Sequence, residues 1–350
     1  MKNSQNVWKR LLRSPQGLSA LIILAIFYAV TLLAPFLAPY QVSDQNLQKT
    51  YHPPTGLVWK DGGLQARVYE NVDPTAAIYR QIGDQATPIH FFAQGFEYKI
   101  LGLIPCERHL FGVAPDQRIY LLGSDATGRD VFSRLLFGTR ISMSIGLAGI
   151  AVTMLLGLIV GGLAGYFGGW VDNLAMRLTE LLMAIPGLYL LLALRSAFAQ
   201  HFSSDQMFFL IVLILSCIGW SGAARVIRGL SLSLRQRPFI HAAEAMGQSP
   251  WIILWKHILP NTLSYLLVAA TLSIPGYILG EAALSFLGIG IQEPSSSWGL
   301  MLSQAQEMKV FMLNFWWLLS PGAAIFLAVV AFNMLGDALR DLVDPKFRLM

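Results

Sequence analysis

The chain has 350 residues, of which 55% are hydrophobic and only 13% are charged, and its mean hydropathy is +0.53. Soluble domains carry about 25% charged residues, so much of this surface faces something other than water, and the composition predicts a membrane protein. The formal net charge of +5 does not point to nucleic acid as a partner. The basic residues flank apolar stretches and form no stripe with interleaved aromatic residues.

The sequence carries no signal for catalysis or for a bound metal. The phosphate-binding signature Gly-Lys-Ser/Thr does not occur, so ATP hydrolysis, where it is needed, belongs to another chain. The six histidines are scattered without the spacing of metal ligands, and Cys106 and Cys217 imply no disulfide framework. We therefore expect no catalytic residue, no metal site and no cofactor.

The first apolar stretch, 17–37, follows a basic segment, 1–16, as it does in a secretory signal. The hydrophobic region of a signal peptide is only about 7–15 residues long, whereas this stretch has about the 20 residues that a membrane-spanning helix needs. The pattern predicts an uncleaved first transmembrane helix. The segment 38–140 is then expected to form an external, periplasmic insertion that ends in a helix leading into the second span.

The insertion is expected to contain β-structure. Its first part is rich in Pro, Gly and Asp, residues that mark turns, and the runs 96–103 and 118–122 read as strands. Further spans are predicted at 141–166, 177–199, 207–225, 262–288 and 316–337. With the first helix this gives an all-α polytopic protein of about six transmembrane helices, whose core is 141–337 and whose tail is 338–350.

Glycines in the second span predict close helix packing. Gly157, Gly161 and Gly165 stand four residues apart on one face, and such small residues let helix backbones approach one another. The alternative is a glycine stripe that faces lipid. We favour packing, because glycine weakens a helix unless a close contact compensates.

Basic residues set the expected orientation, because short cytoplasmic loops are enriched in Lys and Arg. With the N-terminus inside, the short outer loops 200–206 and 289–315 contain Lys309 alone. The inner segments contain Lys2, Lys9, Arg10, Arg13, Arg177, Arg225, Arg228, Arg235, Arg237, Lys256, Arg340, Lys346 and Arg348. We therefore expect a multi-pass protein of the inner membrane with both termini in the cytoplasm.

The longest inner loop, 226–261, predicts two short helices joined at an elbow. Pro238 suits the first helical turn, and Gly247 can end that helix in a left-handed cap. Ser249 and Pro250 can then begin a second helix, which Pro260 is expected to stop. A helix of small residues that ends at a glycine can enter a groove on another protein.

This loop resembles the cytoplasmic "EAA" loop of importer permeases, which runs Glu-Ala-Ala, three residues, Gly, nine residues, Ile-x-Leu-Pro. His241 stands where the family has Glu, His257 replaces the Ile, and Glu244, one turn on, is able to supply the displaced carboxylate. The resemblance implies a site that couples to an ATPase. Its residues in this chain are His241, Ala242, Ala243, Glu244, Ala245, Gly247, Leu259 and Pro260.

A second motif runs from Leu122 to Ser142 and begins Leu-Gly-Ser-Asp-Ala-Thr-Gly-Arg-Asp-Val-Phe-Ser-Arg. It resembles the Leu-Gly-Thr-Asp-x-x-Gly-Arg-Asp-x-x-Ser-Arg signature of the dipeptide/oligopeptide/nickel permeases, where it marks the second, C-type permease subunit. The resemblance covers about 122–350 and the first span. It implies a type I ABC importer fold, a homologous partner permease, two ATPase subunits and a periplasmic solute-binding protein.

Two spans contain residues that suit a translocation path. Pro186 and the pair Pro275-Gly276 predict bends, which either line a path or are purely structural kinks. Glu281 lies at membrane depth, where a carboxylate is costly and should face the bundle interior or an aqueous cavity. It either pairs with Arg195 or borders the path.

Two other classes of protein compete with the ABC importer permease. A self-contained secondary transporter or channel normally needs intramembrane charges as a relay, and few are present. A membrane-anchored structural protein is disfavoured by the five further spans. The sequence does not name the solute, for which the family resemblance allows peptides, nickel, glutathione and other small solutes.

Overall fold

The computed structural model describes residues 9–100, 102–198 and 206–343. Contacts divide the chain into two compact units. One unit consists of 1–22, 145–277 and 329–350, and the other of 23–144 and 278–328.

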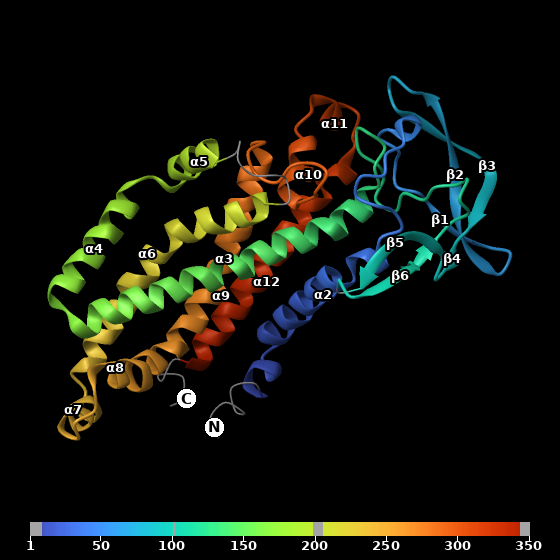
Figure 1. The fold of residues 1–350 in the computed structure, drawn as a ribbon. Coiled ribbons are helices and arrows are strands. Elements are labelled where there is room, and N and C mark those ends of the chain that lie inside the picture. Colours follow the sequence, from blue (N-terminus) through green and yellow to red (C-terminus); the bar gives the residue numbers. More distant parts are fainter. Residues whose placement is uncertain (1–8, 101, 199–205, 344–350) are drawn as a thin grey trace. The chain divides into compact units, whose positions relative to one another are not determined.

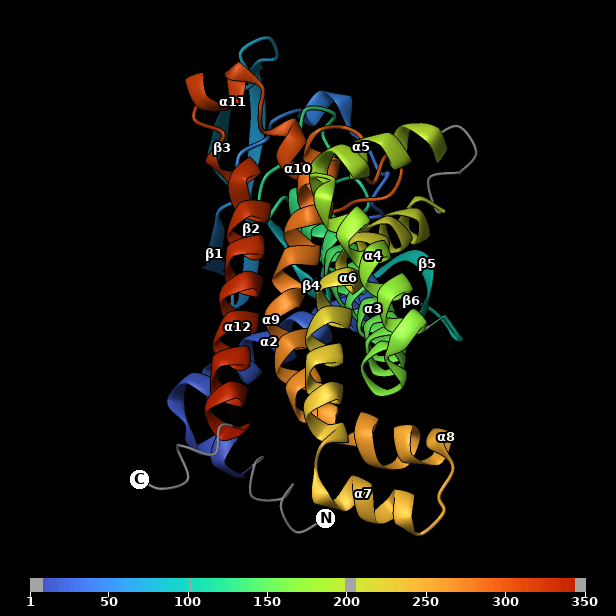
Figure 2. The same cartoon turned by 90° about the vertical axis from the view of Figure 1, so that its left-hand side faces the viewer.

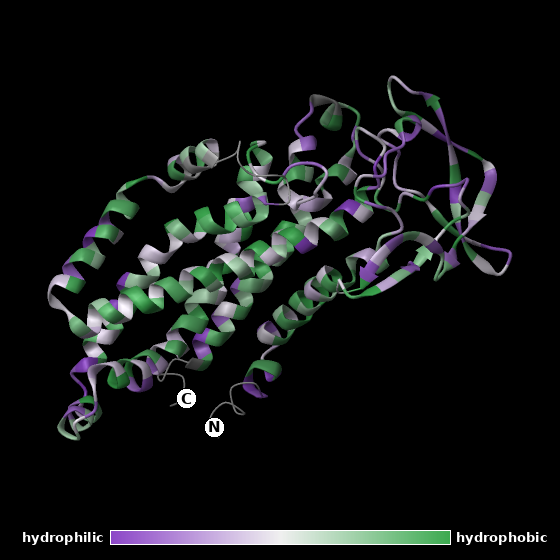
Figure 3. Cartoon of the chain, viewed as in Figure 1, coloured by the Kyte–Doolittle hydropathy of each residue, from purple (hydrophilic) through white to green (hydrophobic). Residues whose placement is uncertain are grey.

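Within the described residues, five helical runs are long and apolar enough to cross a membrane. They are α2 (Pro15–Leu37), α3 (Val131–Phe167), α6 (Met207–Arg235), the run Pro250–Phe286 and the run Trp316–Leu342. The fourth run joins α8 (Pro250–Ile253), a π-helical turn η3 (Leu254–Ile258) and α9 (Leu259–Phe286), and the fifth joins η4 (Trp316–Leu319) to α12 (Ser320–Val343). Figure 3 shows apolar residues along these helices, which form the polytopic helical architecture expected from the composition.

The third predicted span, 177–199, is not one helix. The structure has α4 (Gly169–Ala184) and α5 (Gly187–Phe198) with a break at Ile185-Pro186. Proline disfavours helical backbone in the residue before it, and Ile185 is extended (φ −87°, ψ 124°). Pro186 therefore ends one helix and precedes the next.

Strands occupy most of the segment between α2 and α3 (Figure 1). One antiparallel sheet has the order β1-β2-β3, from Leu57–Lys60, Gly63–Asp73 and Ile78–Pro88. Two further pairs are β4 (His90–Phe91) with β7 (Phe111–Gly112) and β5 (Gln94–Ile100) with β6 (Ile104–Arg108). A short 3-10 helix, η1 (Leu47–Lys49), precedes the strands.

The strand predicted at 118–122 is wrong. Ile119 and Tyr120 are buried there, but side chains bind their amides: the Ile119 N–H donates to the Tyr40 hydroxyl and the Tyr120 N–H to Thr55 Oγ1. The apolar residues of 118–122 are therefore buried, but no neighbouring strand pairs with their backbone. The other predicted strand, 96–103, overlaps β5, which ends at Ile100 before a turn.

The predicted glycine packing is confirmed between α3 and α6. A Cβ on Gly157 would meet Ala223 and Ala224, one on Gly161 would meet the backbone of Ala224, and one on Gly165 would meet Arg228 and Ser231. Without those side chains the two helix backbones come close enough for direct contact. Beyond α6 the chain turns through α7 (Pro238–Ala245) and α8, which Figure 2 shows at one end of the long helices.

Gly161→Ala should destabilise the protein, although alanine is the better helix former by about 1 kcal/mol. Its Cβ would press on the Ala224 backbone, and overpacking of this kind typically costs about 1–3 kcal/mol. Thermal unfolding in detergent should show a lower midpoint. Gly229→Ala is the matched control, because a Cβ on this α6 glycine meets no atom of another element within 4 Å among the described residues. A Gly161→Ala midpoint that equals or exceeds that of the control would contradict the close contact.

Candidate functional site

The elbow, residues 238–253, follows the local rules that its sequence predicts. Pro238 occupies the first turn of α7, and Gly247 has a left-handed backbone with φ of +75°. The Gln248 N–H donates to the Ala243 carbonyl at 3.2 Å and the Gly247 N–H to the Glu244 carbonyl at 2.9 Å. This pair of bonds is the Schellman termination, and it turns the chain sharply toward α8.

The second arm of the elbow begins as predicted but does not end at Pro260. The Ser249 hydroxyl accepts from the Ile252 N–H, with Pro250 at the first helical position. The helix then continues through η3 into α9, where Pro260 is the second residue. Proline is tolerated in the first turn of an α-helix. The α-helical hydrogen bonding begins anew at Leu259, after the π-helical turn, so Pro260 lies in the first turn of α9. His257 Nε2 lies 2.9 Å from Gln248 Oε1, which ties η3 back to the elbow.

The coupling residues implied by the family resemblance divide into an inner and an outer set. Ala243 and Leu259 are buried in a cluster with Tyr166, Ile240 and Ile253. These two residues therefore pack inside the elbow and hold it together. The outer set is exposed and consists of His241, Ala242, Glu244, Ala245, Gly247 and Pro260.

Sequence reasoning missed the apolar part of the outer surface. Met246 is 72% exposed and Trp251 56% exposed, and Phe239 and Trp255 are exposed as well. Beside them, His241 Nδ1 lies 3.3 Å from Glu244 Oε2. The elbow thus exposes large apolar side chains and one carboxylate in addition to the small residues. The signal for this surface was Trp251 and Trp255, which stand four residues apart in the sequence.

A cavity of about 320 Å³ lies between α3, α6 and α9. Thr153 and Tyr277 hydrogen-bond to each other at its wall. The Tyr277 ring packs where Cβ atoms on Gly149 and Gly219 would collide with it, so two glycines make room for this aromatic side chain. Tyr277 and Thr153 were not among the predicted path residues.

The predicted path residues are not gathered at this cavity. Pro275 is buried within α9, which continues through it, and Gly276 is exposed next to Tyr277. Pro186 lies at the break between α4 and α5.

Glu281 is fully buried, and hydroxyl groups bind its carboxylate. Ser142 donates to Oε2 at 3.0 Å and Ser285 to Oε1 at 2.7 Å. The Trp298 N–H donates to the Ser142 hydroxyl at 3.3 Å, which extends the network to α10 (Trp298–Gln304). The side chain of Arg195, its predicted partner, lies outside the described residues.

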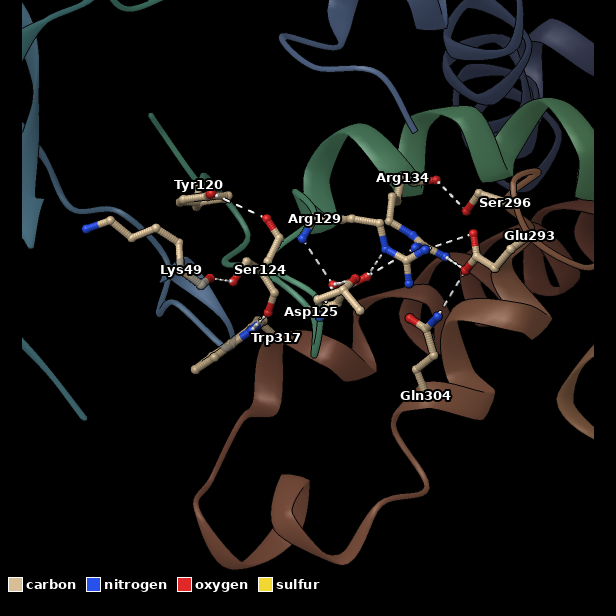
Figure 4. Close-up of polar contacts among 12 residues, drawn as sticks. Lys49, Tyr120, Ser124, Asp125, Arg129, Arg134, Glu293, Ser296, Gln304 and Trp317 are labelled. Atoms are coloured by element: carbon tan, nitrogen blue, oxygen red, sulfur yellow. Dashed lines mark hydrogen bonds and ion pairs between the residues drawn. The ribbon is translucent and has the colours of Figure 1, made fainter. Parts of the chain in front are cut away.

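The Leu122–Ser142 motif forms an ionic cluster, which we define as Asp125, Arg129, Arg134 and Glu293 (Figure 4). Asp125 Oδ2 accepts from Arg129 Nε at 2.7 Å and from Arg134 Nη1 at 3.1 Å. Glu293 Oε2 lies 2.8 Å from Arg129 Nη1, and Glu293 Oε1 lies 2.9 Å from Arg134 Nη2. Two cations and two anions therefore neutralise one another.

The ionic cluster joins three segments that are distant in the sequence. Gln304 of α10 donates to Glu293 at 3.2 Å, and Ser296 donates to the Arg134 carbonyl at 3.2 Å. On its other side, the Trp317 indole donates to the Ser124 carbonyl at 3.0 Å. The motif thus connects the start of α3 to the loop after α9 and to η4 (Figure 4).

Asp130, the second aspartate of the motif, begins α3. Its Oδ2 accepts from the Ser133 N–H at 2.7 Å and from the Ser133 hydroxyl at 2.6 Å, as an N-cap does. The side chain is buried, and this burial raises the pKa of Asp130 to about 7. The two aspartates therefore differ in role, since Asp125 binds arginines and Asp130 caps a helix.

Comparison with known proteins places these features in context. Residues 134–349 match the family model described as binding-protein-dependent transport system inner membrane component, and residues 3–54 match the N-terminal TM domain of oligopeptide transport permease C. The oligopeptide transport system permease protein OppC of Haemophilus influenzae is 41% identical over 242 residues, which cover 69% of this chain and 75% of that protein.

Two further relatives and one solved structure are similar. The glutathione transport system permease protein GsiD of Pectobacterium atrosepticum is 40% identical over 65% of this chain and 73% of its own length. The dipeptide transport system permease protein DppC of Bacillus subtilis is 30% identical over 99% of this chain and 86% of its own length. A chain of the inward-facing MetNI methionine ABC transporter has a TM-score of 0.45 at 19% identity, covering 61% of this chain and 98% of that one.

Arg134→Met should cost about 3–5 kcal/mol in the free energy of unfolding, because it leaves two carboxylates, Asp125 and Glu293, with Arg129 as the one remaining cation of the ionic cluster. The Arg134 side chain is 1% exposed. Arg177→Met is the matched control: it removes an arginine whose side chain is 82% exposed and whose partner Glu180 is one turn away, and such pairs contribute about 0–1 kcal/mol. Both losses are measured by denaturant titration in detergent micelles. Equal losses would contradict the structural role of the ionic cluster.

Proposed function

The chain belongs to the family of binding-protein-dependent transport system inner membrane components, and on that premise we propose how it couples, where it faces and what it carries. The family resemblance of the Leu122–Ser142 motif and of the 235–261 loop is confirmed: the chain is a C-type permease subunit of a peptide ABC importer. As such it forms half of a translocation path. The alternative of a self-contained secondary transporter or channel is not favoured.

The elbow is the surface that receives the ATPase. The observation that carries this proposal is its exposed outer set, together with the exposed side chains of Met246, Trp251 and Trp255, in the segment that follows the long helix α6. Exposed apolar side chains around small residues suit a protein groove. Both arms continue into apolar helices, α6 on one side and α9 on the other. A displacement of the elbow is therefore transmitted to helices that line the 320 Å³ cavity.

The position of the elbow also supports the topology. An ATPase works in the cytoplasm, so the elbow, the basic residues Arg235 and Arg237 beside it and both termini are assigned to that side, in line with the positive-inside rule. The strands between α2 and α3 are then periplasmic. The pair α4 and α5 supplies the third of six crossings, broken at Pro186.

The partners follow from the importer class. A homologous permease completes the path, two ATPase subunits drive it, and a periplasmic solute-binding protein delivers the solute; ATP hydrolysis belongs to those partner subunits. The relatives are named for oligopeptides, dipeptides and glutathione, and we propose a peptide as the solute. The hydroxyl groups of Thr153 and Tyr277 offer hydrogen bonds without a fixed charge, which suits peptides of varied sequence.

Gly247→Asp should abolish peptide uptake by the reconstituted importer while insertion into the membrane stays normal. The change places a side chain on a left-handed backbone and adds a negative charge to the outer set. Among the residues that the structure describes, none beyond the neighbours of Gly247 in the chain lies within 4 Å of the new Cβ, so a loss reports on the backbone turn or on the partner. Uptake and co-purification of the ATPase are measured.

Gln236→Asp is the control for Gly247→Asp, because it adds the same charge at an exposed position before α7. It should keep both uptake and ATPase binding. If Gly247→Asp transports at the wild-type rate with a full complement of ATPase, the elbow is not the coupling surface.

The path proposal rests on α9 beside the cavity. Gly276 is exposed next to Tyr277, and Gly276→Cys, in a chain with Cys106 and Cys217 changed to Ser, should react with a water-soluble thiol reagent. The rate should change when ATP is bound, because the path alternates its access. Leu267→Cys is the control on an exposed apolar position of the same helix, and it should react slowly if it faces lipid. Absence of reaction at position 276 in every transport state would exclude a water-filled path there.

A further inference from the structure

Polar side chains connect α4 to α6. The Arg228 guanidinium binds the Asp172 carboxylate through two parallel contacts, with Nε 2.5 Å from Oδ1 and Nη2 2.5 Å from Oδ2. One turn earlier on α6, Arg225 Nε donates to Thr179 Oγ1 at 3.1 Å, and Arg225 Nη2 lies 3.8 Å from Glu180 Oε1. A two-point arginine–carboxylate pair is stronger than a single hydrogen bond and also sets the relative orientation of the two groups. The Asp172–Arg228 pair therefore fixes how α4 lies on α6.

Apolar packing contributes little to the contact between these two helices. The buried residues of α4 are Ala175 and Thr179, both small. Its large side chains point elsewhere: Trp170, Leu174 and Leu181 are each more than half exposed. Membrane helices associate through close packing and polar contacts, because lipid is as apolar as the helices themselves. Within the part of the chain that the structure describes, the ion pairs are thus the specific link between α4 and α6.

The turn between α3 and α4 does not by itself set the direction of α4. It consists of Gly168 and Gly169, with φ angles of +67° and +58°, and glycine adopts such backbones and many others at little steric cost. Asp172 lies in the first turn of α4, where its N–H donates to the Gly168 carbonyl at 3.3 Å. Its carboxylate therefore directs α4 from the point where the helix begins.

Arg228 contacts both neighbours of α6. Its side chain binds Asp172 on α4, and its backbone lies against α3, where a Cβ on Gly165 would come within 2.5 Å of the Arg228 carbonyl oxygen. The two side chains of the ion pair are only 33% and 16% exposed, and charges in a membrane-spanning run are costly unless they are paired. Arg228 also lies about two turns before Arg235, the last residue of α6. One residue close to the elbow thus joins three helices.

We propose that Asp172 and Arg228 are positioning residues for coupling, which make α4 follow α6 when the ATPase displaces the elbow. The displacement then reaches the break at Pro186, just beyond the end of α4, through α6 and not through the glycine turn. The pair acts through the two helices and touches neither the solute nor the ATPase. The proposal rests on the elbow as the surface that receives the ATPase.

The test measures the distance between two spin labels in the complete importer, reconstituted into liposomes with other subunits that lack reactive cysteines. Leu181→Cys on α4 and Ser233→Cys on α6 carry the labels at exposed positions, in a chain with Cys106 and Cys217 changed to Ser. This chain should show the same single distance without nucleotide and with ADP and vanadate bound. Adding Asp172→Asn should make the distance shift between the two states, because α4 no longer follows α6.

A double variant separates coupling from stability. Asp172→Asn alone leaves the charge of Arg228 without its partner, which should lower the midpoint of thermal unfolding in detergent. Adding Arg228→Gln removes that orphaned charge and should restore much of the midpoint. The state-dependent shift of the label distance should persist in the double variant, because the link is still missing. Recovery of both the midpoint and the constant distance would overturn the proposal, since the pair would then be purely structural.

Arg177→Gln is the matched control, because the Arg177 side chain is 82% exposed and pairs with Glu180 on its own helix. It should leave the label distance the same in both states. A distance that stays constant with Asp172→Asn would contradict the proposal, since α4 would follow α6 without the pair. A distance that already shifts with Asp172 intact would also contradict it, since the two helices would then move separately.

The elbow proposal is decided by a different variant. Gly247→Asp leaves Asp172 and Arg228 in place, and its effect is measured as uptake and as co-purification of the ATPase. Asp172→Asn should keep its full complement of ATPase, because the elbow is unchanged. Failure of the elbow proposal therefore appears with Gly247→Asp, and failure of the positioning proposal appears in the label distances.

Discussion

Arg134 carries a charge that is almost completely removed from solvent, and the unit formed by 23–144 and 278–328 is arranged so that this charge is never unpaired. Its guanidinium reaches Asp125 on one side and Glu293 on the other, and removing ions from water is affordable only with close partners and further hydrogen bonds. This requirement fixes where α3 begins relative to the loop after α9. The carboxylate of Glu281 lies in the same unit and is held by Ser142 and Ser285, so α3 and the end of α9 are joined by a second polar contact.

Helix packing in the other unit depends on glycines, which have no side chains to hold the helices apart. Gly157, Gly161 and Gly165 let α3 lie against α6, and α6 leads directly into the elbow. Ala243 has a similar effect inside the elbow, where a small residue lets α7 pack on Ile253 and Leu254. Close backbone contact of this kind transmits displacement well, because a densely packed interior has no void to absorb it.

The sequence predicted correctly the features that depend on residues close together in the chain. The Gly247 cap, the Ser249 cap and the glycine face of α3 follow from residues a few positions apart, and the structure has them. Pro186 was recognised as a disruption, but the apolar length of 177–199 outweighed it in the prediction of a single span. At Pro260 the opposite error arose, since the π-helical turn that makes this proline harmless has no signature in composition.

The ionic cluster could not be predicted from the sequence, for a different reason. Its motif was recognised as a family signature, yet Arg134 and its partner Glu293 are 159 positions apart, and nothing in one sequence pairs them. The same holds for Thr153 and Tyr277, 124 positions apart. The inner position of Ala243 and Leu259 was missed because a resemblance identifies residues of a site without saying which of them face outward.

The π-helical turn at Leu254–Ile258 has a geometric effect on everything that follows it. A π turn contains one residue more than an α turn, and one residue corresponds to about 100° around a helix axis. The azimuth of every α9 side chain, Tyr277 included, is therefore set by this single surplus residue next to the elbow. Converting that π turn to an α turn would rotate Tyr277 about the axis of α9. The turn therefore links the conformation of the elbow to the direction in which Tyr277 points.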